Sequence, residues 1–295
     1  MSDNNKLSVV VAVQYAQQNL NGIVRNLDPE NHPDTEFLFC YTDVDPETVT
    51  LAASHDNLRL ICGRSGSLIP HLWRDGIIAA KGDRVALTTA HCIPDAGWIE
   101  RLNNADLSDT PAIGGVIEND MASNAKGWAI FMLRYISFAP PQSARVVQEI
   151  AADNALYRRA DIMQHMDLLE EGFWEPSFHV RFRAAGLGLM FDPGLRVVQH
   201  NRYSTGQFFA QRLAHGRAFG RDRAREISIS KRILLIVLSP VLPLVFLRKI
   251  LKSVIGNAHC KSQLLRALPW LFLFLVAWGV GETRGYLSAG LRTGR

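Results

Sequence analysis

The sequence predicts an α/β fold: an open, mostly parallel sheet flanked by helices, with a C-terminal hydrophobic helical segment that associates with a membrane. Two observations support this prediction. Short β-branched runs alternate with helical patterns over about the first 90 residues, as is typical of parallel βαβ units. Residues 202–295, in contrast, are basic and contain long uncharged apolar stretches.

Length and composition bound the possible answers. With 295 residues the chain has room for one large domain or for one domain and an appendage. Its 47% hydrophobic and 20% charged residues exclude a disordered or collagen-like chain. Residues 1–201 hold 16 basic and 25 acidic residues, whereas 202–295 hold 16 and 3. We therefore expect one domain over 1–225 and basic, apolar helices over 226–295.

Four buried strands are predicted from continuous apolar runs in the first third of the chain. They are Leu7–Val13, Glu36–Tyr41, Asn57–Cys62 and Arg84–Thr88, with helices at Leu20–Leu27 and Ile69–Lys81. Ligands bind beyond the carboxyl ends of the strands in such sheets. This rule directs attention to Gln14, Asp43, Asp45 and the residues after Leu87.

Further elements follow in the second third. Two helices are expected at Asp161–Glu171 and Phe178–Ala185, and strands at Ala112–Ile117, Leu189–Phe191 and Arg196–Gln199. The apolar segment Trp128–Phe138 fits either an amphipathic or a strand-like pattern.

The tail contains two uncharged apolar stretches, Ile233–Leu247 and Ala267–Gly281. A 15-residue helix covers roughly 22 Å, less than the roughly 30 Å of a hydrocarbon core. Basic residues occur both between and outside the stretches, which favours an interfacial hairpin over two short transmembrane segments. A pair of core helices in a soluble domain is the remaining alternative.

The four cysteines form no Cys-x-x-Cys motif, and the first residues lack the apolar core of a signal peptide. A reducing environment is therefore expected. We predict a membrane-associated protein whose catalytic domain is on the cytoplasmic side. Cys40 and Cys62 lie in apolar runs and are predicted to be buried.

Several nucleotide-binding motifs are missing: the sequence has no Gly-x-Gly-x-x-Gly after the first strand, no Gly-Lys-Ser/Thr loop and no Gly-x-Ser-x-Gly elbow. Other motifs occur in a characteristic order. They are Val9–Val13, Arg74-Asp75-Gly76-Ile77, Ala80-Lys81-Gly82-Asp83, Pro94-Asp95-Ala96-Gly97-Trp98, Asp153-Asn154-Ala155-Leu156-Tyr157-Arg158-Arg159 and Phe191-Asp192-Pro193 running to His200. Over roughly residues 7–225 this set resembles the family 2 inverting nucleotide-sugar glycosyltransferases, which have the GT-A fold.

One departure from that family concerns the metal. Its members usually place an Asp-x-Asp after the fourth strand, where carboxylates hold Mg²⁺ or Mn²⁺ on the diphosphate. Here the stretch is Thr88-Thr89-Ala90-His91, without an acid. The resemblance leaves His91 and His200 as candidate ligands for Mn²⁺ or Mg²⁺. It also implies that His91 contacts the nucleotide-sugar. The alternative for His91 is a hydrogen-bonded histidine near the site.

A second departure concerns the general base. Inverting transfer needs a carboxylate to take the proton of the acceptor hydroxyl. The segment Phe173-Trp174-Glu175-Pro176-Ser177-Phe178-His179 resembles the Trp-Glu-x-x-x-His variant of the family. Glu175 is therefore the candidate base, and Trp174 a candidate surface for an acceptor sugar. The alternative is that Glu175 caps the following helix, with Pro176 in its first turn.

The resemblance also assigns binding residues. Gln14, Asp43, Asp45 and Arg74 would contact the nucleotide-sugar, while Asp153, Asn154, Arg212, His215 and Arg217 would lie on the acceptor or phosphate side. Plain structural roles are the alternatives: an Asx-turn for Asp43, a solvated helix residue for Arg74, a turn for Asp153 and Asn154, and a basic membrane-surface helix for the last three.

The predicted function is transfer of a sugar from a UDP- or GDP-type donor to a lipid-linked or cell-envelope glycan acceptor, with inversion at the anomeric carbon. The basic tail predicts an anionic membrane surface as a partner, and no nucleic acid is expected. A catalytically degenerate partner subunit at the membrane is one alternative, and a soluble nucleotide-dependent enzyme of another α/β class is a second.

Overall fold

The computed structural model describes residues 6–42 and 55–288, which divide into two compact units. We call the part within 1–120 and 138–202 the sheet unit, and the part within 121–137 and 203–295 the helical unit. Each is described by itself.

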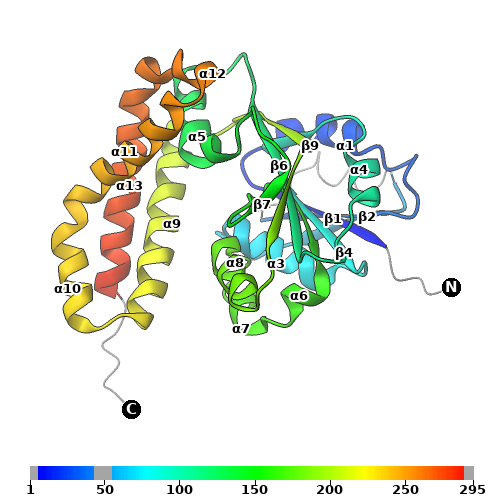
Figure 1. Ribbon diagram of the computed structural model, residues 1–295, viewed down its shortest axis with the longest axis horizontal. Coiled ribbons are helices and arrows are strands. Elements are labelled where there is room, and N and C mark those ends of the chain that lie inside the picture. The colour runs from blue at the N-terminus through cyan, green and yellow to red at the C-terminus, as the bar shows by residue number, and fades with distance from the viewer. Residues whose placement is uncertain (1–5, 43–54, 289–295) are drawn as a thin grey trace. The chain divides into compact units, whose positions relative to one another are not determined.

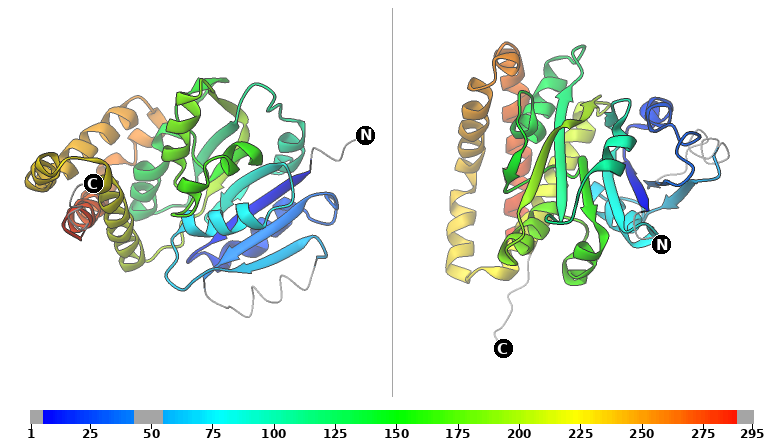
Figure 2. Two further views of the ribbon diagram at one scale, coloured as in Figure 1. Left: turned by 90° about the horizontal axis from the view of Figure 1, so that it is seen from below. Right: turned by 45° about the vertical axis from the view of Figure 1, so that its right-hand side comes forward.

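The sheet unit contains a mixed sheet to which nine strands of the described residues contribute. They are β1 (Leu7–Val13), β2 (Glu36–Tyr41), β3 (Leu58–Cys62), β4 (Arg84–Thr89), β5 (Cys92–Pro94), β6 (Ala112–Asn119), β7 (Arg145–Val147), β8 (Asn154–Arg158) and β9 (Leu189–Gln199). Strands β3, β2, β1 and β4 are parallel neighbours (Figure 2), as are β6 and β9. Strand β8 runs antiparallel between β4 and β6. The predicted, mostly parallel sheet is confirmed.

Helices cover both faces of this sheet, which explains why its central strands are apolar throughout. The sheet unit includes α1 (Leu20–Leu27), α3 (Ile69–Ala79), α4 (Trp98–Asn104), α6 (Arg159–Met163), α7 (Met166–Leu169) and α8 (Glu175–Ala184). On one face, Val10 and Ala12 of β1 share a buried core with Leu72 of α3 and Phe178 of α8. On the other face, Trp98 of α4 donates its indole N–H to the side chain of Asn154.

The later elements differ from the sequence prediction in several places. Strands β5, β7 and β8 and helix α4 were not predicted, and α8 begins at Glu175 rather than at Phe178. A single strand, β9, replaces the two predicted short strands, and its pairing with β6 shifts register after Gly115. The predicted helix Asp161–Glu171 is broken into α6 and α7, which are separated at Gln164 and His165.

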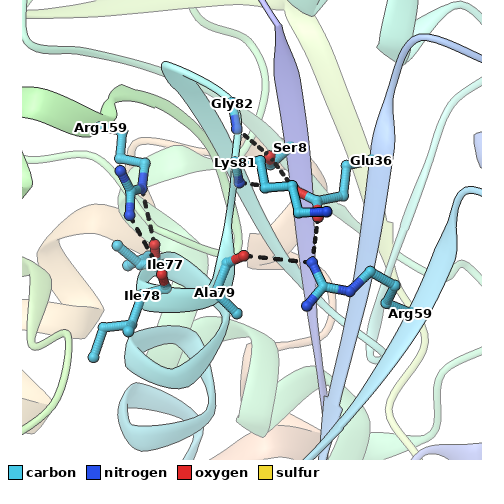
Figure 3. Close-up of polar contacts among 9 residues, drawn as sticks. All are labelled: Ser8, Glu36, Arg59, Ile77, Ile78, Ala79, Lys81, Gly82 and Arg159. Atoms are coloured by element: carbon cyan, nitrogen blue, oxygen red, sulfur yellow. Dashed lines mark hydrogen bonds and ion pairs between the residues drawn. The ribbon is translucent and has the colours of Figure 1, made fainter.

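The amino edge of the sheet holds a closed polar cluster (Figure 3). Glu36 accepts hydrogen bonds from the Ser8 hydroxyl at 2.7 Å and from the Lys81 amide at 2.9 Å, and it pairs with Arg59 at 2.5 Å. Burial raises the pKa of Glu36, but these bonds and the Arg59 charge outweigh burial and lower that pKa below its ordinary value. The cluster joins the starts of β1 and β2 to the loop before β4.

Cys40 is buried in the core beneath α3, as predicted, but Cys62 is exposed. The prediction for Cys62 was wrong because β3 is the last strand at its edge of the sheet, so the end of this strand has a neighbour on one side alone among the described residues.

The helical unit is built from α5 (Ala125–Tyr135), α9 (Thr205–Glu226), α10 (Ile229–Leu238), α11 (Leu242–Ile255), α12 (Ala258–Lys261) and α13 (Leu264–Ser288). The segment Trp128–Phe138 is thus mainly helical, in α5 and the 3₁₀ turn that follows it. Phe208 of α9 and Phe274 of α13 pack edge to face with ring centroids 4.7 Å apart. The second segment of the helical unit begins at Tyr203, so α9 groups by its packing with the C-terminal helices.

Helices α9 and α13 lie side by side along much of their length (Figure 1). Two Gly-x-x-x-Gly pairs permit this approach: Gly216 and Gly220 on α9, and Gly281 and Gly285 on α13. A Cβ atom on any of the four would come within 2.2–2.3 Å of a backbone oxygen of the facing helix. Small residues at this spacing let two helix backbones touch.

The apolar helices are longer than the sequence suggested. Ile229–Ile255, which includes α10, a 3₁₀ turn and α11, has 27 residues, and Leu264–Ser288 has 25. At about 1.5 Å per residue both exceed a hydrocarbon core of roughly 30 Å. The argument that the apolar stretches are too short to span therefore does not hold. The two helices are long and apolar enough to cross a membrane.

Candidate functional site

The carboxyl edge of the sheet brings together three residues predicted from separate parts of the sequence. Gln14 follows β1, His91 lies between β4 and β5, and His200 follows β9. The His91 ring nitrogen Nε2 is 2.9 Å from the Gln14 carbonyl oxygen, and the His200 amide donates to the His91 carbonyl at 2.7 Å. Both Gln14 and His91 are buried.

Asp120 is a residue of this edge that the sequence reasoning missed. Its carboxylate lies 3.0 Å from Nδ1 of His200, and both side chains are partly exposed. Asp120 directly follows β6, and β6 is parallel to β9. The rule that selected Gln14, a polar residue just after a strand, would also have selected Asp120.

Asp153 supplies a buried carboxylate next to the end of β4. The Thr89 hydroxyl donates to Asp153 Oδ1 at 3.1 Å, and the Thr88 hydroxyl donates to the Asp153 carbonyl at 2.9 Å. The residues Thr88-Thr89-Ala90 contain no acid, yet the fold places one against them from the start of β8.

Asn154 is turned into the protein. Its side-chain amide donates to the carbonyls of Val116 and Leu195, and its oxygen accepts the Trp98 N–H. It is fully buried. The side chain therefore joins β8 to β6, β9 and α4, which fits a structural role.

The segment before α8 is held against the start of α3 by three contacts. The Phe173 amide donates to the Pro70 carbonyl at 2.8 Å, and Arg74 donates to the Glu170 carbonyl at 3.1 Å. The Trp174 ring meets His71 edge to face. Arg74, predicted to face a diphosphate, also pairs with its neighbour Asp75 at 2.7 Å.

Gly172 sets the direction of this segment. Its φ of +116° is in the region that favours glycine. A Cβ there would also lie 3.0 Å from the His71 ring and 3.2 Å from the Trp174 indole nitrogen. Glycine thus allows Trp174 and Glu175 to follow directly after a tight turn.

Glu175 is the first residue of α8, with Pro176 in the same turn and Trp174 at the N-cap position. This is the geometry of the capping alternative, and a carboxylate is stabilised by the helix dipole there. Both Glu175 and Trp174 are half-buried, whereas Phe173 is fully buried against Tyr157 and Phe178. Trp174 is thus the aromatic side chain of this segment that retains exposed surface.

Tyr157 is fully buried, and its pKa responds to this burial and to three acidic side chains. Burial raises the pKa of Tyr157 well above its ordinary value. The negative charges of Glu175, Glu149 and Asp153 raise this pKa further. The candidate base and the acid beside Thr89 are thus two of the charges that act on Tyr157.

A relay of hydrogen-bonded side chains extends from the buried Tyr157 to the exposed Glu149. Its hydroxyl is 3.1 Å from Nε2 of His179, and Nδ1 of His179 is 2.6 Å from Glu149, which also pairs with Arg183 at 3.0 Å. His179 is fully buried and is located one turn after Glu175 on α8. This relay fixes the first turn of α8 and hence the position of Glu175.

Two groups of predicted site residues lie outside the described part of the sheet unit. Asp43 and Asp45 lie outside the described residues. Arg212, His215 and Arg217 belong to the helical unit, where the guanidinium of Arg212 donates to His215 at 3.1 Å.

The described residues do not assemble a divalent-metal centre. Among residues 6–42 and 55–288, no cluster of three or more His, Cys, Asp or Glu side chains has metal-binding geometry. His91 directs Nε2 toward Gln14 and His200 directs Nδ1 toward Asp120, so each imidazole already serves a protein contact. The side chains present do not fit the metal that the resemblance implies, and we derive no chemical step through one.

Comparisons with known proteins identify the fold. No protein-family model matches the chain, and no curated protein matches its sequence. A mannosyltransferase from Pyrobaculum calidifontis, solved with GDP-Man and Mn²⁺, is similar in structure with a TM-score of 0.51 and 13% identity. The match covers 93% of this chain and 86% of that one. A mycobacterial protein matches with a TM-score of 0.46 and 12% identity, over 72% and 73% of the two chains. The predicted GT-A-like α/β fold is confirmed.

Proposed function

We propose that this protein transfers a sugar from a UDP- or GDP-type nucleotide-sugar to a lipid-linked or cell-envelope glycan acceptor, with inversion, as a membrane-associated family 2 glycosyltransferase. The main support is the placement of Glu175 in the first turn of α8 and of Asp153 against Thr89, together with a carboxyl edge formed by Gln14, His91 and His200. The fold shared with a mannosyltransferase is consistent with this proposal.

The proposed reaction needs a base on the acceptor side. The acceptor hydroxyl attacks the anomeric carbon and its proton passes to the Glu175 carboxylate. The bond from the anomeric carbon to the diphosphate oxygen breaks, and the nucleoside diphosphate leaves with the electron pair. Attack opposite the leaving group inverts the configuration. Trp174 would carry the acceptor sugar on its exposed surface.

The donor would lie across the carboxyl edge. Gln14 is anchored there by donating to the Ser67 carbonyl at 2.9 Å, at the loop that leads into α3. Asp153, Asp120 and His200 supply further polar groups at this edge. We assign donor binding to this edge and base catalysis to the first turn of α8.

A membrane location is supported by the helical unit. Helices α10 and α11 expose a row of large apolar side chains, among them Ile233, Val237 and Leu244, each more than half exposed. Helix α13, however, packs along α9, which carries five arginines. A span by α13 would bring α9 into the hydrocarbon, where arginine is costly. We therefore favour an interfacial position on an anionic, cytoplasmic leaflet.

The proposal is tested with full-length protein and a panel of UDP- and GDP-sugars, with membrane lipid extract as the acceptor. We expect release of one nucleoside diphosphate together with a glycosylated lipid whose anomeric configuration, read by NMR, is opposite to that of the donor. Retained configuration would exclude inversion. Absence of binding and turnover across the panel, with and without added Mn²⁺, would reject the transferase assignment.

One observation favours the alternative of a degenerate partner subunit. Thr89 and Ala90, at the family's acidic positions, are fully buried, and the Thr89 hydroxyl is bonded to Asp153. A donor that binds stoichiometrically, without any release of nucleoside diphosphate, would support that alternative.

A further inference from the structure

The helical unit contains a cavity of about 260 Å³ that none of the predicted catalytic steps uses. Its walls come from α5 with the turn after it, α9, α11 and α13. On α11 the lining residues Phe246, Lys249, Ile250 and Ser253 recur at helical spacing, so one continuous face of the helix forms a wall.

The lining is cationic. Arg134, Arg212 and Lys249 all border the cavity, and no carboxylate lines it among the described residues. The whole helical unit has 17 basic and 3 acidic residues. Two of its acids are committed elsewhere, because Asp222 pairs with Arg221 and Arg225, and Glu282 accepts from Trp278 and Tyr286. Such a cavity attracts an anion.

Arg212 is held in place before any ligand arrives. Its guanidinium lies over the rings of Phe208 and Trp278, at 5.2 and 5.3 Å from their centroids, and it donates to His215. Only 7% of the residue is exposed. A planar guanidinium fixed between aromatic rings is suited to hydrogen-bond an oxyanion such as a phosphate.

The remaining walls are apolar, and the cavity is small. Phe246, Ile250 and Leu275 line it beside Trp278. Its volume is just below the roughly 300–1,000 Å³ of pockets that enclose drug-sized ligands. It therefore accommodates a headgroup and the first carbons of a chain. On the same α11, Leu244 and Val245 are each 56% exposed and offer a surface along which a longer chain can continue.

We propose that this cavity binds the phosphomonoester headgroup of a single lipid, with Arg134, Arg212 and Lys249 holding the phosphate and Phe246, Ile250 and Leu275 holding the start of the chain. Binding of the lipid in this cavity does not depend on which residues catalyse transfer. The further step, that a lipid phosphomonoester is the class of sugar acceptor, rests on the proposed function.

Calorimetric titration of full-length protein with dodecyl phosphate tests the proposal. Dodecyl maltoside serves as the background detergent, because it carries the same chain on a neutral headgroup. We expect saturable binding of one dodecyl phosphate per chain, weakened about tenfold in Lys249→Gln and in Arg134→Gln by loss of a charge-assisted hydrogen bond. Lys249→Arg should restore the affinity.

Lys252→Gln is the matched control, since Lys252 is exposed on the same helix and does not line the cavity. Equal binding by Lys249→Gln, Arg134→Gln and Lys252→Gln would overturn the proposal. Inorganic phosphate that binds as tightly as dodecyl phosphate would overturn the lipid assignment. Release of nucleoside diphosphate from a donor, measured without dodecyl phosphate, reports on the proposed function separately.

Discussion

The two sides of the sheet unit use acidic side chains differently. At the amino edge, Glu36 is surrounded by donors from Ser8, Lys81 and Arg59, which lower its pKa. On the α8 face, Glu149 is likewise held by His179 and Arg183, which outweigh burial and lower its pKa. Burial and the charges of Glu175, Glu149 and Asp153, in contrast, raise the pKa of Tyr157.

This difference distinguishes carboxylates that stabilise the fold from carboxylates that are available for catalysis. A carboxylate surrounded by donors stabilises the chain and has little capacity left for a substrate. On the α8 face, Glu175 and Asp153 act on a buried tyrosine whose pKa is raised, and perturbed groups of this kind are typical of sites that move protons. The comparison therefore predicts that substitutions at the amino edge change stability alone, while substitutions at the start of α8 change activity.

The largest expected effect is that of Glu175→Gln. If Glu175 is the base, the amide cannot accept the proton, and transfer should fall by about 10²–10⁴-fold. The melting temperature should change little, because glutamine keeps the shape of the side chain. Glu171→Gln, in the same segment, is the control and should retain activity. Full activity in Glu175→Gln would mean that Glu175 is not the base and only caps α8.

His179→Leu is expected to come next. It removes the partner of the Tyr157 hydroxyl and of Glu149 inside the protein, and should reduce the free energy of unfolding by about 2–3 kcal/mol. Urea denaturation measures this loss. Combining it with Tyr157→Phe should cost less than the sum of the single changes; simple additivity would show that the two residues do not act together.

Glu36→Gln should lower the unfolding free energy by about 1–2 kcal/mol without any effect on transfer. Because the folded pKa of Glu36 is below the unfolded value, its contribution is present above about pH 4.3 and is lost as the pH falls further. Urea titrations of the wild type and the variant at pH 7 and pH 3 should therefore differ at the higher pH and converge at the lower. A constant difference would contradict the assigned cause.

Arg59→Gln should have the smallest effect, below about 1 kcal/mol, because its side chain is 44% exposed and the ion pair with Glu36 is screened by water. The loss should shrink further when salt is raised to 1 M. A loss of unfolding free energy equal to that of Glu36→Gln would mean that the ion pair supplies most of the stability of the polar cluster at the amino edge, rather than the hydrogen bonds from Ser8 and Lys81.

The sequence prediction was accurate for features set by residues close together in the chain and missed contacts between residues far apart in it. Strands β1 and β2 coincide with the predicted runs because an uninterrupted apolar segment of that length has one stable place, inside a sheet covered on both faces. The predicted helix Phe178–Ala185 began three residues too late, although proline in the first turn was a local signal for the alternative in which Glu175 caps the helix. Glu149 was not found, because its partner His179 is 30 residues away in the chain. Asp120 could have been found, because it directly follows a strand, but its pairing with His200, 80 residues away, could not.

The sequence by itself determined the fold class, the early strands, the acidic character of the first two-thirds and the basic, apolar character of the tail. These depend on composition and on periodicities read within a few residues. Only the tertiary structure decided that Asp153 would stand beside Thr89, that α9 would pair with α13 through four glycines, and that Arg134, Arg212 and Lys249 would border one cavity. The physical reason is that a contact between distant segments depends on how all the intervening elements pack, and no local pattern records that.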